Sequence, residues 1–180
     1  MITRRSFAVL PLCLLSACAT PDFNGVQSLQ PNEGLLLTQC QANISNALSV
    51  YESGYDVSKF FRHLSESEVI ISCPRENKLS LLKIKEGDYF IGDQYAGPPF
   101  QPQAQALNFT ITAGKVNYIG DLRYDLVSRE NNGTQYRIHE LKIVNNFNGA
   151  KAKLSQQMPA IAKNYGAVSA VAKVPMTKGE

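Results

Sequence analysis

The amino-acid sequence predicts a mainly β protein, an antiparallel β-sandwich of about seven strands with one helix near the C-terminus. Three observations lead to this fold class. From residue 34 onward, apolar and polar residues alternate in short runs, as in strands that are buried on one face. Gly, Pro, Asn and Asp separate these runs, as turns require. After residue 150 the apolar spacing changes to three and four residues, the period of a helix.

The first half of the domain contains four strand patterns, at residues 35–44, 68–73, 78–85 and 88–94. An ambiguous amphipathic segment lies at 57–64. Pro74 ends the second pattern, because proline cannot donate a hydrogen bond to a neighbouring strand. Glu86 and Gly87 separate the last two patterns, and Gly favours tight turns. We therefore predict a β-hairpin at this point.

The second half contains strand patterns at 107–111, 116–126 and 136–144. A proline-rich stretch at 93–105 predicts a long connection before them. Turns are expected at 113–114 and at 131–133, where small, polar residues and Gly occur. Gly120 interrupts the middle pattern, and a glycine inside a strand is typical of a β-bulge.

The helix is predicted from a single apolar face, made by Leu154, Met158, Ile161 and Tyr165. Asn148 is a candidate N-cap and Gly166 a candidate residue just after the helix. Pro159 should kink the helix or split it in two. We expect it to close one end of the sheets, with an edge strand following at 167–174.

The N-terminus has the three parts of an export signal. Arg4 and Arg5 are basic, residues 7–15 are apolar, and small residues then precede Cys18. The apolar run is too short to cross a bilayer core of about 30 Å, which needs about 20 apolar residues. It fits the apolar part of a cleaved signal peptide instead.

The four residues Leu15-Ser16-Ala17-Cys18 resemble the lipobox of bacterial lipoproteins. This resemblance implies cleavage before Cys18, a diacylglycerol on its sulfur and an acyl chain on its amino group, with no other cofactor. The membrane would then be a partner, through the lipid. Ala19, where inner-membrane lipoproteins carry Asp, favours the outer membrane, at its periplasmic face. The alternative is an ordinary secretory signal cleaved near Ala17 or Ala19.

The export route has two interpretations. Residues 3–7 resemble a twin-arginine signal, although Ala8 and Val9 depart from its usual continuation. The other interpretation is the general secretory route. In either case we divide the chain into a signal peptide (1–17), a lipidated N-terminus and flexible tether (18–33), the β-sandwich domain with its helix (34–175) and a frayed tail (176–180).

Two cysteines remain in the expected domain, Cys40 and Cys73. Both fall on the apolar phase of a predicted strand. A pair of cysteines in an oxidising compartment favours a disulfide. Buried free thiols are the alternative.

The charge of the chain gives no sign of nucleic-acid binding. The net charge is +3, and removal of Arg4 and Arg5 leaves 16 basic against 15 acidic residues. A nucleic-acid-binding domain carries a clustered basic stripe instead. We therefore predict no nucleic-acid partner.

No catalytic or metal-binding motif occurs, so we predict that the protein is not an enzyme. The histidines are His63, in the ambiguous amphipathic segment, and His139, in a predicted strand. Scattered carboxylates are better explained as solvated charge than as metal ligands; they are Glu66, Glu68, Asp121 and Asp125.

The connection at 93–105 contains the one surface feature that predicts binding. Tyr95 and Phe100 lie between its prolines, and exposed aromatic residues often anchor protein partners. A stiff connection whose rings fold back onto the sheet is the alternative.

Two segments resemble small envelope lipoproteins with a transthyretin-like or immunoglobulin-like domain. They are 82–91, a strand followed by Gly, one residue, Tyr and a second strand, and 109–122, a strand, a Gly turn and a Tyr-Ile-Gly strand. The resemblance covers residues 34–166 and implies a fold and a location, not a reaction. It leaves three hypotheses: a non-enzymatic binding or structural module with an envelope protein partner, an accessory lipoprotein of a secretion or pilus machine, and a periplasm-facing hydrolase.

Overall fold

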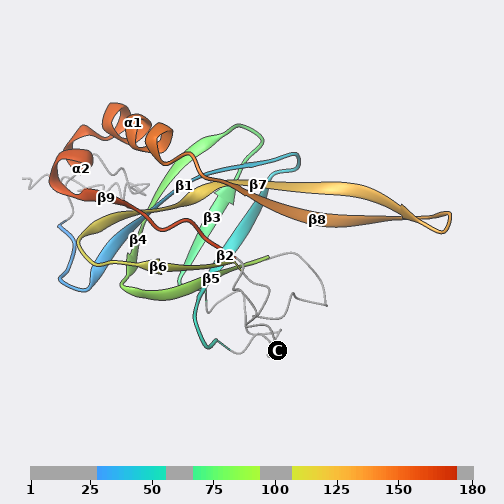
Figure 1. Cartoon of the computed structure of the whole chain (residues 1–180), viewed down its shortest axis with the longest axis horizontal. Coiled ribbons are helices and arrows are strands. Elements are labelled where there is room, and N and C mark those ends of the chain that lie inside the picture. Colours follow the sequence, from blue (N-terminus) through green and yellow to red (C-terminus); the bar gives the residue numbers. More distant parts are fainter. Residues whose placement is uncertain (1–27, 56–66, 94–106, 174–180) are drawn as a thin grey trace, which may run out of the picture.

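A computed structural model describes residues 28–55, 67–93 and 107–173. The predicted segments at 1–17 and 57–64 lie outside these ranges. The described residues are mainly β and form two sheets and two short helices (Figure 1). The strands are β1 (Glu33–Ala42), β2 (Asn46–Glu52), β3 (Val69–Cys73), β4 (Lys78–Lys85), β5 (Gly87–Asp93), β6 (Leu107–Ile111), β7 (Lys115–Asn131), β8 (Thr134–Val144) and β9 (Gly166–Ser169).

The larger sheet has the order β4-β1-β7-β8, with β9 added to β7, and the smaller sheet has the order β3-β2-β5-β6. β1 and β9 both run parallel to β7, whereas the other pairs are antiparallel. The prediction of an all-antiparallel sandwich of about seven strands was therefore wrong in detail. The larger sheet is mixed because β1 and β9 each pair with β7 in parallel. The residues of β1 and β7 that pair are about 80 positions apart in the sequence.

Both predicted turns before β7 join different sheets and make no hairpin. Lys85 at the end of β4 pairs with Glu33 in the larger sheet, whereas Gly87 pairs with Ile111 in the smaller one. The Glu86 N–H donates to the Asn32 carbonyl, so the preceding chain holds this corner. The turn after β6 likewise leads from the smaller sheet into the larger one. The hairpin predicted at Glu86 was therefore wrong.

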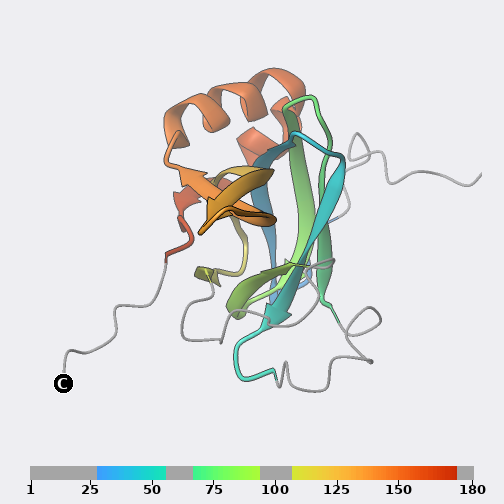
Figure 2. The same cartoon turned by 90° about the vertical axis from the view of Figure 1, so that its right-hand side faces the viewer.

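The larger sheet is covered on both faces. On one face Leu36 and Cys40 of β1 pack against the smaller sheet, and on the other Leu35 and Leu37 pack against the helices. Figure 2 shows the helices stacked on the outer side of the larger sheet. The prediction that the helix closes one end of the sheets is corrected, because Leu154 and the other buried helical residues cover the face formed by β1, β4 and β7.

Proline splits the predicted helix into α1 (Phe147–Gln157) and α2 (Pro159–Asn164), which confirms that prediction. The N-cap position is taken by Asn146, not Asn148. The Asn146 side chain makes no capping bond there; its amide nitrogen donates to Asp121 Oδ2 at 3.1 Å. This contact ties the start of α1 to the larger sheet.

The domain begins earlier than predicted. Residues 28–32, which we assigned to the tether, pack on the domain. Leu29 is partly buried in the core beneath the helices, and the Gln30 N–H donates to Glu33 Oε2 at 2.8 Å. The first strand lies two residues earlier than the predicted range of 35–44, and Ile44, which is 50% exposed, lies beyond its end. β2, which follows directly, was not predicted.

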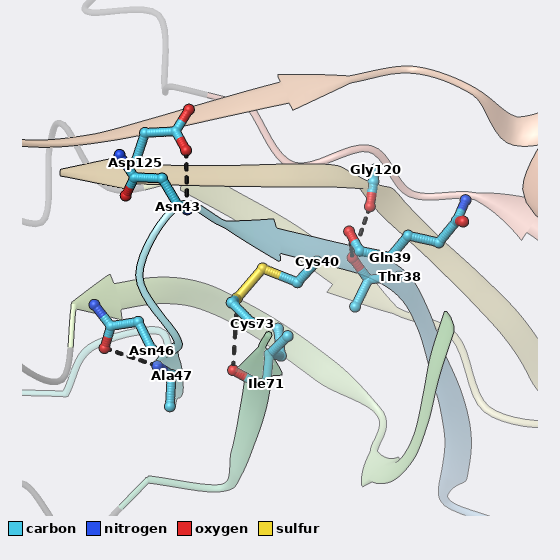
Figure 3. The surroundings of a disulfide bond; sticks show 10 residues. All are labelled: Thr38, Gln39, Cys40, Asn43, Asn46, Ala47, Ile71, Cys73, Gly120 and Asp125. Atoms are coloured by element: carbon cyan, nitrogen blue, oxygen red, sulfur yellow. Dashed lines mark hydrogen bonds between the residues drawn. A yellow bond between two sulfur atoms is a disulfide. The ribbon is translucent and has the colours of Figure 1, made fainter. Parts of the chain in front are cut away.

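A disulfide joins the two sheets along one side. Cys40 of β1 and Cys73 of β3 form this bond, with their Cα atoms 4.7 Å apart (Figure 3). Beside it, the Ala42 N–H donates to the Pro74 carbonyl at 2.9 Å, and Gln41 Nε2 donates to the Arg75 carbonyl. The connection between the sheets is therefore both covalent and hydrogen-bonded.

The opposite side is joined by the last described residues. After β9 the chain continues along β7, where the Ala170 and Ala172 N–H groups donate to the carbonyls of Tyr118 and Ile119. At Lys173 it changes partner and pairs with Asn108 of β6 in the smaller sheet. This short segment thus connects the two sheets.

Candidate interaction surfaces

The most prominent feature of the molecule is a projecting two-stranded ribbon. β1 stops pairing with β7 at Tyr124, but β7 and β8 continue as a pair from Asp125 and Glu140 to Asn131 and Thr134. Figure 1 shows this ribbon extending well beyond the two sheets. At about 3.4 Å per residue, the part beyond Tyr124 is roughly 24 Å long.

The tip of the ribbon is the turn that the sequence predicts at 131–133. Asn132 and Gly133 both have positive φ, at 50° and 76°. Such a two-residue turn matches the twist of the flanking strands, and Asn followed by Gly adopts it readily. The turn closes the ribbon without an irregular loop.

Charged side chains connect the two strands of the ribbon. Arg129 of β7 pairs with Glu140 of β8, and Lys142 lies 3.3 Å from the same carboxylate. The hydrogen bond from Arg129, with the help of Lys142, holds the pKa of Glu140 below its ordinary value. These pairs are solvent-exposed, so each contributes little stability.

The root of the ribbon is defined by Asn43, the first residue after β1. Its side-chain amide donates to the Leu126 carbonyl at 2.8 Å and accepts from the Leu126 N–H at 2.9 Å. Its own N–H donates to Asp125 Oδ1, as Figure 3 shows. The amide group thus replaces the next residue of β1, and beyond it the β7 edge has no strand partner in the described chain.

A polar network lies behind the root, between the larger sheet and α1. Asp121 of β7 accepts from Gln39 Nε2 at 3.0 Å and from the Tyr118 hydroxyl at 2.9 Å. Asn146 donates to the other Asp121 oxygen, and Lys153 of α1 donates to Gln39 Oε1. The interpretation of Asp121 as solvated charge is therefore wrong, because its carboxylate accepts hydrogen bonds from three side chains.

Tyr118 is fully buried in this network, as is Gln39. The Tyr118 hydroxyl also accepts from the Asn146 N–H at 2.9 Å. Burial, together with the neighbouring Asp121 carboxylate, raises the pKa of Tyr118 to about 12. The tyrosine therefore stays protonated, and its role is to join β7 to the start of α1.

A groove of about 560 Å³ lies where β6 and the segment after β9 separate. Its walls include Asn108, Thr110, Thr112, Asn145, Ser169 and Val171. Amide and hydroxyl groups predominate among these side chains. Such a lining suits a ligand with both donors and acceptors.

Of the residues singled out from the sequence, the structure describes the cysteine pair, which forms the disulfide. Cys18, Tyr95 and Phe100 lie outside the described residues, as does His63. The backbone of His139 lies in β8, opposite Leu126.

Two further findings concern metals and membranes. Within residues 28–55, 67–93 and 107–173, no group of three or more His, Cys, Asp or Glu side chains could hold a metal ion. Of the helices in these ranges, neither is long and apolar enough to cross a bilayer.

Gly120 forms the predicted β-bulge in β7, between Tyr118 and Asp121 of the polar network. Between Leu37 and Gln39 of β1, β7 has one extra residue, and Gly120 has a φ of 113°. The Gly120 carbonyl accepts from Thr38 Oγ1 at 2.7 Å. The bulge places both Tyr118 and Asp121 on the helix side of the sheet.

Comparison with protein-family models finds no match for this chain, and comparison with curated proteins finds no significant relative.

Proposed function

We propose that this chain is a lipid-anchored protein of a bacterial envelope whose β domain is a non-enzymatic binding module. The observation that carries the proposal is the sequence Leu15-Ser16-Ala17-Cys18 after a short apolar run. Lipidation of Cys18 would anchor the domain to a membrane. Ala19 favours the outer membrane.

The direction of β1 supports a contact role for the ribbon. β1 enters the domain at Glu33 and runs parallel to β7 towards the ribbon. The ribbon therefore projects away from the end at which the anchor would attach. Residues 19–27 can span at most about 30 Å. A domain held this close to a membrane would present the ribbon to components farther from the bilayer.

The anchor is tested with two cysteine variants of the full-length protein. Cys18→Ala should abolish incorporation of radiolabelled palmitate and leave the uncleaved precursor, because the lipid-accepting thiol is absent. Cys13→Ala is the matched control and should be labelled and processed like the wild type. The proposal fails if Cys18→Ala is still labelled and membrane-bound after alkaline extraction.

The contact role is tested by photo-crosslinking in intact envelopes. A photoreactive residue replaces Gln135 near the tip of the ribbon, and in a control Gln156 on the exposed side of α1. We expect a discrete crosslinked species from Gln135 that is absent from Gln156. Equal products from both positions, or none from Gln135, would remove the ribbon from the proposed function.

A further inference from the structure

The groove between β6 and the segment after β9 is an interrupted strand pair. Asn108 and Lys173 exchange two backbone hydrogen bonds, at 2.8 and 2.9 Å. Continued in the same antiparallel register, Thr110 would face Val171. Within the described part of the chain no backbone hydrogen bond joins these two residues, and both line the groove.

The backbone groups on both walls point into this space. In an antiparallel pair, every second residue directs its N–H and C=O to the same side. Asn108 uses the side facing Lys173, so Thr110 directs its groups to that side as well. On the other wall Ala170 and Ala172 donate to β7, so Val171, between them, faces β6.

Asn108, where the groove closes, carries a side-chain oxygen, Oδ1, that is buried and has no hydrogen-bond partner in the described structure. A buried acceptor without a partner costs about 1–3 kcal/mol. At the far end Asn117 occupies both backbone groups of Thr112, which limits the open stretch to a few residues.

The charge of the groove indicates which end of a bound peptide would lie at its closed end. Lys173 is the one charged residue among those that line it in the described chain. It lies where the two walls join, so a chain inserted along the groove would have to end there. A carboxylate at that end would be complementary to the lysine.

We propose that the groove binds a short extended peptide of a partner protein, added as a strand between β6 and the segment after β9, with a carboxylate at Lys173. Strand addition obtains affinity from main-chain hydrogen bonds. The inference rests on the proposed function as a binding module and specifies the chemistry of one partner. Peptide binding is measured without a membrane, so its failure is separate from failure of the lipid anchor.

The test uses the full-length chain in detergent and an acetylated hexapeptide of alternating valine and threonine with a free carboxyl terminus. Calorimetry measures affinity, and hydrogen exchange with mass spectrometry follows segments containing Thr110 and Val171. We expect saturable binding and slower exchange in both segments. Methylating alternate peptide nitrogens removes donors but keeps the side chains, and should weaken binding about tenfold or more.

The carboxylate is tested with Lys173→Gln, which removes an exposed charge and keeps the backbone pairing. This variant should weaken binding of the free-acid peptide severalfold and leave its amidated form unchanged. Lys151→Gln on α1 is the matched control and should behave like the wild type. The proposal is overturned if the methylated peptide binds equally well, or if Lys173→Gln has no effect. It is also overturned if an N-acetylglucosamine tetrasaccharide protects these segments and the peptide does not.

Discussion

The disulfide between Cys40 and Cys73 allows a quantitative prediction. The two residues are 33 positions apart. In the chain-entropy description, closing such a loop stabilises the folded state by about 3.7 kcal/mol at 25 °C. Both side chains are fully buried, so the double variant Cys40→Ala/Cys73→Ala also loses apolar contacts. Reduced wild-type protein separates these effects, because it keeps both sulfur atoms.

The assay is urea unfolding of the oxidised, reduced and doubly substituted domain, followed by circular dichroism. With an unfolding slope of about 2 kcal/mol/M, reduction should lower the urea midpoint by about 2 M. The double variant should lie somewhat lower still. Alkylation and mass measurement under non-reducing conditions should find no free thiol at either position. A midpoint that shifts by less than about 0.5 M on reduction would refute the reasoning.

Three further predictions concern single positions. Gly120→Ala should destabilise the fold by about 2–4 kcal/mol in urea unfolding, because positive φ is strained and the new Cβ would overlap Ile143; Gly114→Ala, with positive φ and open space, should cost only about 1 kcal/mol. Tyr118→Phe should cost about 1–3 kcal/mol at neutral pH. Because the pKa of Tyr118 is raised to about 12 from about 10, the wild-type advantage should persist below pH 10 and decline as the pH rises towards 12. Ala19→Asp should move the lipidated protein from the outer to the inner membrane in a density gradient.

Local patterns in the sequence predicted most strands and turns. A short apolar run with lysine at both ends predicted β4 at its observed bounds, and the turn at 131–133 predicted the tip of the ribbon. β2 was missed because it carries apolar residues on both faces: Leu48 packs between the sheets and Tyr51 stacks with Phe90 on the outer face. Such a run lacks the alternation of a half-buried strand.

The pairing of strands was harder to predict than their existence. β1 and β7 are joined in parallel although their residues are about 80 positions apart, and no local signal records such a pairing. The hairpin at Glu86 was wrong for the same reason, since pairing of Gly87 with Ile111 draws the chain into the other sheet. The resemblance to transthyretin-like and immunoglobulin-like lipoproteins, and the signal peptide, stay predictions.

The candidate surfaces were missed because each depends on several distant elements. The polar network behind the root joins Gln39 of β1, Asp121 of β7 and Lys153 of α1. In the sequence, each of these residues by itself is typical of an exposed polar position. The groove is lined by backbone as well as side chains, and backbone groups have no signature in a sequence. The one local signal near the network was the predicted N-cap Asn148, which lies two residues after the observed N-cap Asn146 and takes no part in the network.

The ribbon cannot be understood apart from its root. An isolated two-stranded ribbon is at best marginally stable in water, and the exposed ion pairs of this one add little. Its strands must therefore be held in place where β7 pairs with β1, by Asn43 at the edge and by Tyr118 and Asp121 behind it. Because β1 also carries the chain from the proposed anchor, one strand pair connects membrane attachment to the ribbon. Replacement of Asp121 by Ala should thus change the crosslinks formed from Gln135 at the tip, whereas palmitate labelling of Cys18 should stay as in the wild type.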